Sequence, residues 1–154
     1  MASTITAGTL TVKITETIAL NGTNMDATNS LVINSINEIS QRILTVPDGN
    51  IIVVFEFGAS VGSGTFIKGD VKYIRITNKD DTNPVDINLA TASSNQWTRL
   101  EAAKSFIVSG ATNMSEGVSS SSVTASVVAD LVKLSAYIPQ GDPPVDIDCY
   151  VAMT

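Results

Sequence analysis

Apolar and polar residues alternate along most of this chain with the period of a β-strand. Leu10, Val12 and Ile14 alternate with Thr and Lys residues, which is the pattern of a strand with one buried and one solvated face. Further short segments are rich in β-branched residues and are bounded by Gly, Pro and Asn: LVINSI, RILTVP, QWTRLE, KSFIVSG, VADLVKLSAYIP and VDIDCYVAMT. Such segments at intervals of about 8 to 12 residues predict an all-β fold.

The stretch 71–90, VKYIRITNKDDTNPVDINLA, predicts two strands on either side of a polar turn. Ile74 lies on the apolar face of the first strand and Ile87 on the apolar face of the second. Residues 78–83 are turn formers, and Pro84 can open a strand but cannot sit within a ladder. We interpret the stretch as a hairpin whose paired strands face one core.

Two other segments give clear local signals. Residues 51–57, IIVVFEF, form an apolar run that only Glu56 interrupts, which favours a strand covered on both faces. Residues 21–29, NGTNMDATN, contain an Asn-Gly pair and predict a loop. Helical periodicity is confined to SINEISQRIL and VVADLVKL. The expected fold is a single antiparallel β-sandwich over residues 1–154, jelly-roll or immunoglobulin-like, with at most one short helix.

Composition changes this picture by excluding some partners. The chain has 9 Lys and Arg against 15 Asp and Glu, for a net charge of -6, so a nucleic acid backbone would be repelled. No apolar stretch approaches the roughly 20 residues that span a bilayer, and the N-terminal sequence has no signal-peptide pattern. We therefore expect synthesis in the cytoplasm and no nucleic acid or membrane partner.

Few residue types that carry chemistry are present. The chain has no His, which excludes an imidazole base and a Ser-His-Asp triad. Its single Cys149 alternates with apolar residues and is expected to be a buried, inert thiol. Paired carboxylates are the remaining catalytic option, and we expect no enzyme and no cofactor. The candidate carboxylates are Asp80, Asp81, Asp86, Asp142, Asp146 and Asp148.

A weak metal site and an aromatic platform are the other candidates. Asp80, Asp81 and Asn83 offer oxygens that could bind a cation such as Ca²⁺, although a turn capped by its own side chains explains them better. Trp97 with Arg99 could stack on a sugar, but a lone Trp is more often part of a core or an interface. The other aromatic candidates are Tyr73, Tyr137 and Tyr150.

Two segments have compositions that pack poorly within one subunit: an N-terminal arm at residues 1–7 and a Ser-rich loop at residues 111–126. Ordering each backbone residue costs about 1 to 2 kcal/mol, and Ser, Thr and Ala side chains recover little of it. We predict that at least one segment packs against another copy or another protein by adding to a sheet edge. The interface candidates are Ser3, Thr4, Ile5, Ser119, Ser120 and Ser121.

Several segments together resemble small virion structural proteins of tailed bacteriophages, such as head-decoration and tail-associated β-sandwich subunits. These segments are ASTITAGTLTVKI, VKYIRITNKDDTNPVDINL, QWTRLEAAKSFIV and VDIDCYVAMT. The resemblance implies a non-enzymatic subunit that assembles in the host cytoplasm and ends in the virion. Its implied partners are copies of itself and other virion proteins, such as the major capsid or tail protein.

The expected function is therefore a structural subunit of a phage particle, such as a capsid decoration or cement protein or another head or tail lattice protein. It would act by self-association and docking. A carbohydrate-binding or receptor-binding β-sandwich module is the alternative.

Overall fold

The computed structural model describes residues 5–114 and 128–154, and these residues form strands and no helix. The all-β sandwich expected from the sequence is confirmed. The strands are β1 (Gly8–Glu16), β2 (Ala19–Leu20), β3 (Thr23–Asn24), β4 (Ala27–Ile36), β5 (Glu38–Val46), β6 (Ile51–Gly58), β7 (Thr65–Ile67), β8 (Val71–Asn78), β9 (Val85–Thr91), β10 (Asn95–Leu100), β11 (Ser105–Val108), β12 (Leu131–Tyr137) and β13 (Val145–Met153).

The chain divides into two compact units. The first unit runs to Glu38 and includes Thr154, and it contains an N-terminal hairpin built from β1 to β4. The second unit, Ile39–Met153, contains the sandwich. The sandwich that the sequence predicts for residues 1–154 thus lies within this second unit.

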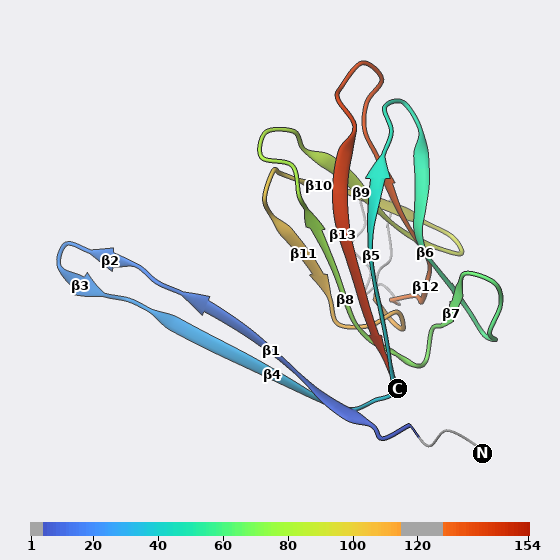
Figure 1. Ribbon diagram of the computed structural model, residues 1–154, viewed down its shortest axis with the longest axis horizontal. Coiled ribbons are helices and arrows are strands. Elements are labelled where there is room, and N and C mark those ends of the chain that lie inside the picture. Colours follow the sequence, from blue (N-terminus) through green and yellow to red (C-terminus); the bar gives the residue numbers. More distant parts are fainter. Residues whose placement is uncertain (1–4, 115–127) are drawn as a thin grey trace, which may run out of the picture. The chain divides into compact units, whose positions relative to one another are not determined.

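The N-terminal hairpin pairs β1 with β4 in antiparallel register and continues into a narrow tip formed by β2 and β3 (Figure 1). The tip turns on Asn21 and Gly22, whose φ angles are 50° and 78°. Positive φ at both central residues defines the two-residue turn that matches the twist of paired strands. The loop predicted for residues 21–29 is therefore wrong beyond this turn, because β3 and the start of β4 fall inside it.

The sandwich consists of two sheets that enclose one core. One sheet has the strand order β10-β9-β12-β6-β7, and the other has the order β11-β8-β13-β5 (Figure 1). The pairing of β6 with β7 is parallel, unlike the antiparallel pairs β12-β6, β12-β9 and β13-β8. Alternate residues of both sheets fill the core, among them Val54, Phe55, Ile74, Ile76, Ile87, Leu134, Ile147 and Val151.

The hairpin predicted for residues 71–90 is wrong in its pairing. β8 pairs with β11 and β13, whereas β9 pairs with β10 and β12 in the other sheet. Ile74 and Ile87 are nevertheless fully buried in the same core, as the alternation predicts. The connection at residues 79–84 crosses from one sheet to the other, because each strand finds partners from distant parts of the chain.

The last strand confirms the expectation for the single cysteine. Cys149 on β13 is fully buried in the core, together with Val145, Ile147 and Val151. Burial raises the pKa of the Cys149 thiol to about 12, so the reactive thiolate is scarce at neutral pH. The thiol acts as a small apolar side chain.

Candidate assembly surfaces

The N-terminal hairpin has one apolar face, which we call the apolar hairpin face. In the β1-β4 register, Leu10 lies opposite Ile33, Val12 opposite Leu31, and Ile14 opposite Asn29. Directly opposed residues of an antiparallel pair lie on the same side of the sheet. The apolar hairpin face therefore consists of Leu10, Val12, Ile14, Leu31 and Ile33.

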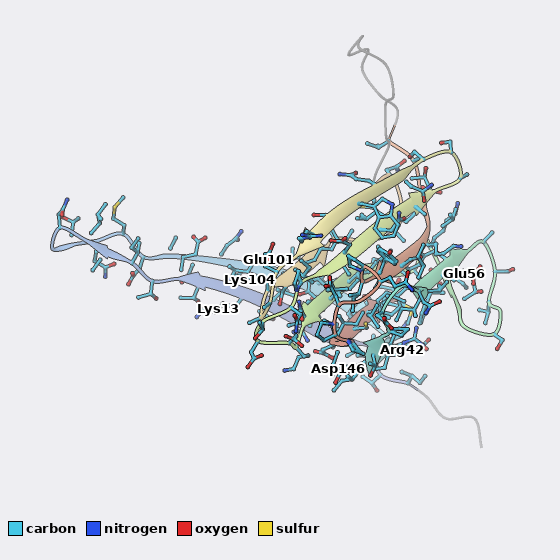
Figure 2. All side chains as sticks on the ribbon, turned by 90° about the horizontal axis from the view of Figure 1, so that it is seen from above. Lys13, Arg42, Glu56, Glu101, Lys104 and Asp146 are labelled. Atoms are coloured by element: carbon cyan, nitrogen blue, oxygen red, sulfur yellow. The ribbon has the colours of Figure 1, made fainter. Side chains whose placement is uncertain are left out.

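The residues of this face are exposed or only partly covered. No residue from 5 to 35 is buried, and Ile14 and Leu31 keep 49% and 47% of their surface exposed. At the tip, Ile18, Leu20 and Met25 are exposed by 53%, 56% and 60%. Figure 2 shows the side chains of the hairpin projecting on both sides of its ribbon.

The opposite face of the N-terminal hairpin is mainly polar. It pairs Lys13 with Ser30, Thr15 with Thr28, and Thr11 with the one apolar residue, Val32. An isolated two-stranded hairpin is marginally stable at best in water. A hairpin with one polar and one apolar face is therefore a structure that gains most of its stability when another surface covers the apolar side.

The sandwich has a second uncovered apolar surface, on the outer face of its five-stranded sheet. Tyr137 of β12 lies between Ile51 of β6 and Asp86 of β9, and the adjacent row contains Val53. In that adjacent row, Trp97 of β10 pairs with Asn88 of β9, Asn88 pairs with Ser135 of β12, and Ser135 pairs with Val53 of β6. We call the residues Ile51, Val53, Trp97 and Tyr137 the sheet patch.

The exposure of the sheet patch corrects the expectation for residues 51–57. The apolar run predicts a strand covered on both faces, but Ile51 and Val53 are exposed by 60% and 48%. Only the side of β6 that carries Val54, Phe55 and Phe57 is buried. The bulge opposite Leu134 and Ser135 contributes, because it places both Val54 and Phe55 toward the core.

A shallow pocket of about 280 Å³ lies in the sheet patch and is lined by Ile51, Asp86, Trp97 and Tyr137. Trp97 and Tyr137 meet edge to face, with ring centroids 6.2 Å apart. Arg99 donates two hydrogen bonds to the Asp86 carboxylate, at 2.9 and 3.4 Å. Of the aromatic candidates, Trp97 is thus half exposed at a pocket, whereas Tyr73 is buried.

The candidate carboxylates on β13 make structural contacts. Asp148 forms an ion pair with Arg75 at 2.8 Å and accepts a hydrogen bond from Gln41, and the Arg75 guanidinium lies over the Tyr150 ring. The Asp146 carboxylate accepts a hydrogen bond from the Thr45 hydroxyl at 2.6 Å. These groups hold neighbouring strands together on the outer face of the four-stranded sheet.

Asp80, Asp81 and Asn83 lie in the connection between β8 and β9, where they form a capped turn. One Asp80 carboxylate oxygen accepts hydrogen bonds from the backbone amides of Thr82 and Asn83, at 2.8 and 2.7 Å. These bonds, the Asn83 amide first, lower the pKa of Asp80 below its ordinary value. In the part of the chain that the structure describes, no three acidic or Cys side chains gather to hold a metal ion.

The predicted interface residues are only partly described. Ile5 precedes β1 and is exposed. Ser3, Thr4, Ser119, Ser120 and Ser121 lie outside the described residues, as does most of the Ser-rich loop.

Comparisons with known proteins add no family to this description. No family model matches the chain, and neither the curated proteins nor the solved structures give a significant match. Within residues 5–114 and 128–154, no helix is long and apolar enough to cross a membrane.

Sequence reasoning missed both apolar surfaces. The alternation of Leu10, Val12 and Ile14 was visible, but it indicated a half-buried strand of the sandwich. A usable signal was present in the Asn21-Gly22 pair, which is typical of a two-residue hairpin turn between two alternating segments. It would have paired β1 with β4.

Proposed function

We propose that this chain is a structural subunit that assembles with copies of itself by covering the apolar hairpin face. The particle that we propose is a tailed phage virion, in which the subunit acts as a capsid decoration or cement protein or as another head or tail lattice protein. The observation that carries the proposal is a nine-residue strand, β1, whose three apolar residues face the same side as Leu31 and Ile33 and are not buried.

The size of the hairpin supports a reciprocal contact. Nine residues of β1 extend about 30 Å, and two strands are about 10 Å wide, so one face offers about 300 Å². Burial of that area contributes about 7 kcal/mol at about 25 cal/mol per Å². Association itself costs about 4 to 15 kcal/mol. Exchange of two hairpins between two copies doubles the contact and brings it closer to the roughly 800 Å² per partner of stable interfaces.

A lattice strengthens such contacts without further chemistry. When many copies are held on one particle, each additional contact forms at high effective concentration, which adds avidity. The absence of His from the chain and the structural use of Asp80, Asp146 and Asp148 are compatible with a role that needs no catalytic group. The placement in a phage particle is supported by the resemblance of the segments quoted above.

The test replaces one residue on each face of β1. Ile14→Asp puts a charge into the apolar hairpin face, and Thr15→Asp puts the same charge at the next position on the polar face. We expect Ile14→Asp to weaken self-association at least tenfold in sedimentation velocity, since about 1.4 kcal/mol suffices for that change. Thr15→Asp should change it little.

Self-association of the wild-type protein and its binding to intact particles test the proposal directly. A protein that stays monomeric at high concentration and does not bind intact particles would contradict the proposal. If it does bind, electron microscopy of decorated particles will locate it on the head, neck, tail or fibre.

A second candidate function is a carbohydrate-binding or receptor-binding module. It is favoured by one observation, the half-exposed Trp97 beside Tyr137 at a pocket that also contains the Asp86 carboxylate. A glycan array with the wild-type protein and Trp97→Ala tests it. Binding that depends on Trp97 would support this function, and silence on the array would remove it.

A further inference from the structure

We propose that the sheet patch receives an apolar side chain from the tip of the N-terminal hairpin of a second copy. This inference rests on the proposed function, because it names the surface that the hairpin contacts. The sheet patch consists of Ile51, Val53, Trp97 and Tyr137, and the tip presents Ile18, Leu20 and Met25.

The sequence of β6 is that of a strand with two covered faces. Its residues Ile51 to Phe57 are apolar except for the exposed Glu56, and such nearly continuous apolar runs are typical of strands that are buried on both sides. One side is buried in the core, while Ile51 and Val53 remain exposed on the other. A covering surface outside the sandwich accounts for the apolar residues on the exposed side.

The chemistry of the pocket favours an apolar occupant. Ile51, Trp97 and Tyr137 supply most of its lining, and the one carboxylate, Asp86, already accepts two hydrogen bonds from Arg99. A hydroxylated ligand would have to compete for this carboxylate. The volume of about 280 Å³ is enough to hold one apolar side chain.

The tip of the hairpin is a suitable apolar donor. The Met25 amide donates to the Ile18 carbonyl at 2.9 Å, which places these two residues opposite each other. Leu20 is two residues from Ile18 and therefore lies on the same face. The two-residue turn at Asn21 and Gly22 keeps the tip narrow, so these exposed side chains can enter a shallow pocket.

The composition of the sheet patch matches that of interface centres. Trp, Tyr and Arg are the residues that most often dominate binding energy, in positions surrounded by other contacts that exclude water. Trp97 and Arg99 lie on β10 and Tyr137 lies on β12, the two strands that flank β9, and the Trp97 and Tyr137 rings are in contact. If the occupant is a second copy, the contact covers both the tip and the sheet patch. Each subunit can then insert its own tip into one neighbour and bind the tip of another.

The single tryptophan makes the contact directly measurable. Because Trp97 is the only Trp in the chain, its fluorescence reports only on the sheet patch. We expect the emission to shift to shorter wavelength and acrylamide quenching to fall severalfold as the concentration is raised through the assembly range. Leu20→Asp should abolish both changes. Asn24→Asp, with the same charge at a tip position opposite Ala19, should preserve them.

Disulfide trapping identifies the two partners. Leu20→Cys and Val53→Cys are prepared as separate proteins and mixed under mild oxidation, so that only a contact between copies can link them. The native Cys149 is buried and does not compete. We expect a cross-linked dimer from this mixture and at least tenfold less from Thr15→Cys with Val53→Cys.

The outcomes separate this inference from the proposed function. If Ile14→Asp prevents assembly but Trp97 emission does not change during wild-type assembly, the hairpin contacts another surface and this inference is overturned. If the protein does not self-associate at all, both proposals fail. A shift of Trp97 emission on addition of a saccharide to dilute monomer, unaffected by Leu20→Asp, would overturn the inference in favour of a glycan site.

Discussion

Strands β1 and β8 have the same alternating pattern but opposite surroundings. On β8, Ile74 and Ile76 are fully buried between two sheets. On β1, Val12 is only partly covered and Ile14 is half exposed. The pattern of a strand therefore specifies that one face will be covered, but it does not specify whether the same chain or another one covers it.

This difference separates two kinds of stability. Burial of the β8 side chains stabilises the sandwich itself, because their partners belong to the same unit. Burial of the apolar hairpin face would stabilise an assembly and would depend on protein concentration. Substitutions in the sandwich core should therefore lower the stability of the single subunit, whereas substitutions in the apolar hairpin face should weaken self-association.

The largest expected effect is that of Ile74→Asp. A charge at this fully buried position has no partner, and its cost of several kcal/mol is a large part of the stability of an ordinary domain. We expect loss of the cooperative thermal transition in circular dichroism. Ile14→Asp should leave the transition temperature of the dilute protein nearly unchanged. An equal loss from both variants would show that the hairpin is part of the sandwich core.

Asn78→Ala should have the next largest effect. This residue is buried, and its side-chain amide donates to the carbonyl oxygens of Asn83 and Leu100, at 2.8 and 3.2 Å. Removal of the amide leaves these groups unpaired at a cost of about 1 to 3 kcal/mol. Chemical denaturation will measure it. Lys79→Ala at the next position should cost almost nothing, and a larger loss from it would contradict our assignment of the turn.

Two glycine substitutions compare the units directly. Gly22 and Gly141 have φ angles of 78° and 97°, and a Cβ at either position meets no atom within 4 Å. Alanine should therefore cost only the backbone strain of about 1 to 2 kcal/mol. Gly141→Ala should lower the melting temperature of the sandwich by several degrees. Gly22→Ala should instead speed hydrogen exchange of the hairpin amides and leave that temperature unchanged.

The smallest expected effect concerns acid stability. Because the pKa of Asp80 is lowered in the folded chain, the ionised carboxylate stabilises the fold above its ordinary pKa, and this contribution is lost as pH falls through the folded-state value. The difference in unfolding free energy between wild type and Asp80→Asn should be constant near neutral pH and shrink below about pH 4. Asp81→Asn controls for loss of one negative charge.

The sequence predicted the core better than the pairing of strands. Burial of Ile74, Ile87 and Cys149 follows from alternation, which depends only on neighbouring residues. The separation of β8 and β9 into different sheets does not, because it depends on which distant strands compete for their edges.

The candidate surfaces were less predictable for the same reason. The apolar residues of β1 and β6 were recognised, but periodicity does not state what covers an apolar face. The assignment of residues 21–29 to a loop failed because β3 has only two residues, Thr23 and Asn24, and both are polar. Its strand geometry comes from the turn beside it.

The strand order of the five-stranded sheet has a consequence for the timing of assembly. β12 lies between β6 and β9. The five-stranded sheet can therefore form only after β12, which is late in the chain, has paired with both of these strands. Local hairpins form within about 1 to 10 µs, whereas β-sandwiches that pair distant segments take milliseconds to seconds. The N-terminal hairpin can thus form much faster than the sheet on which we propose that it docks. Slow closure of the sandwich should delay polymerisation until each subunit has folded.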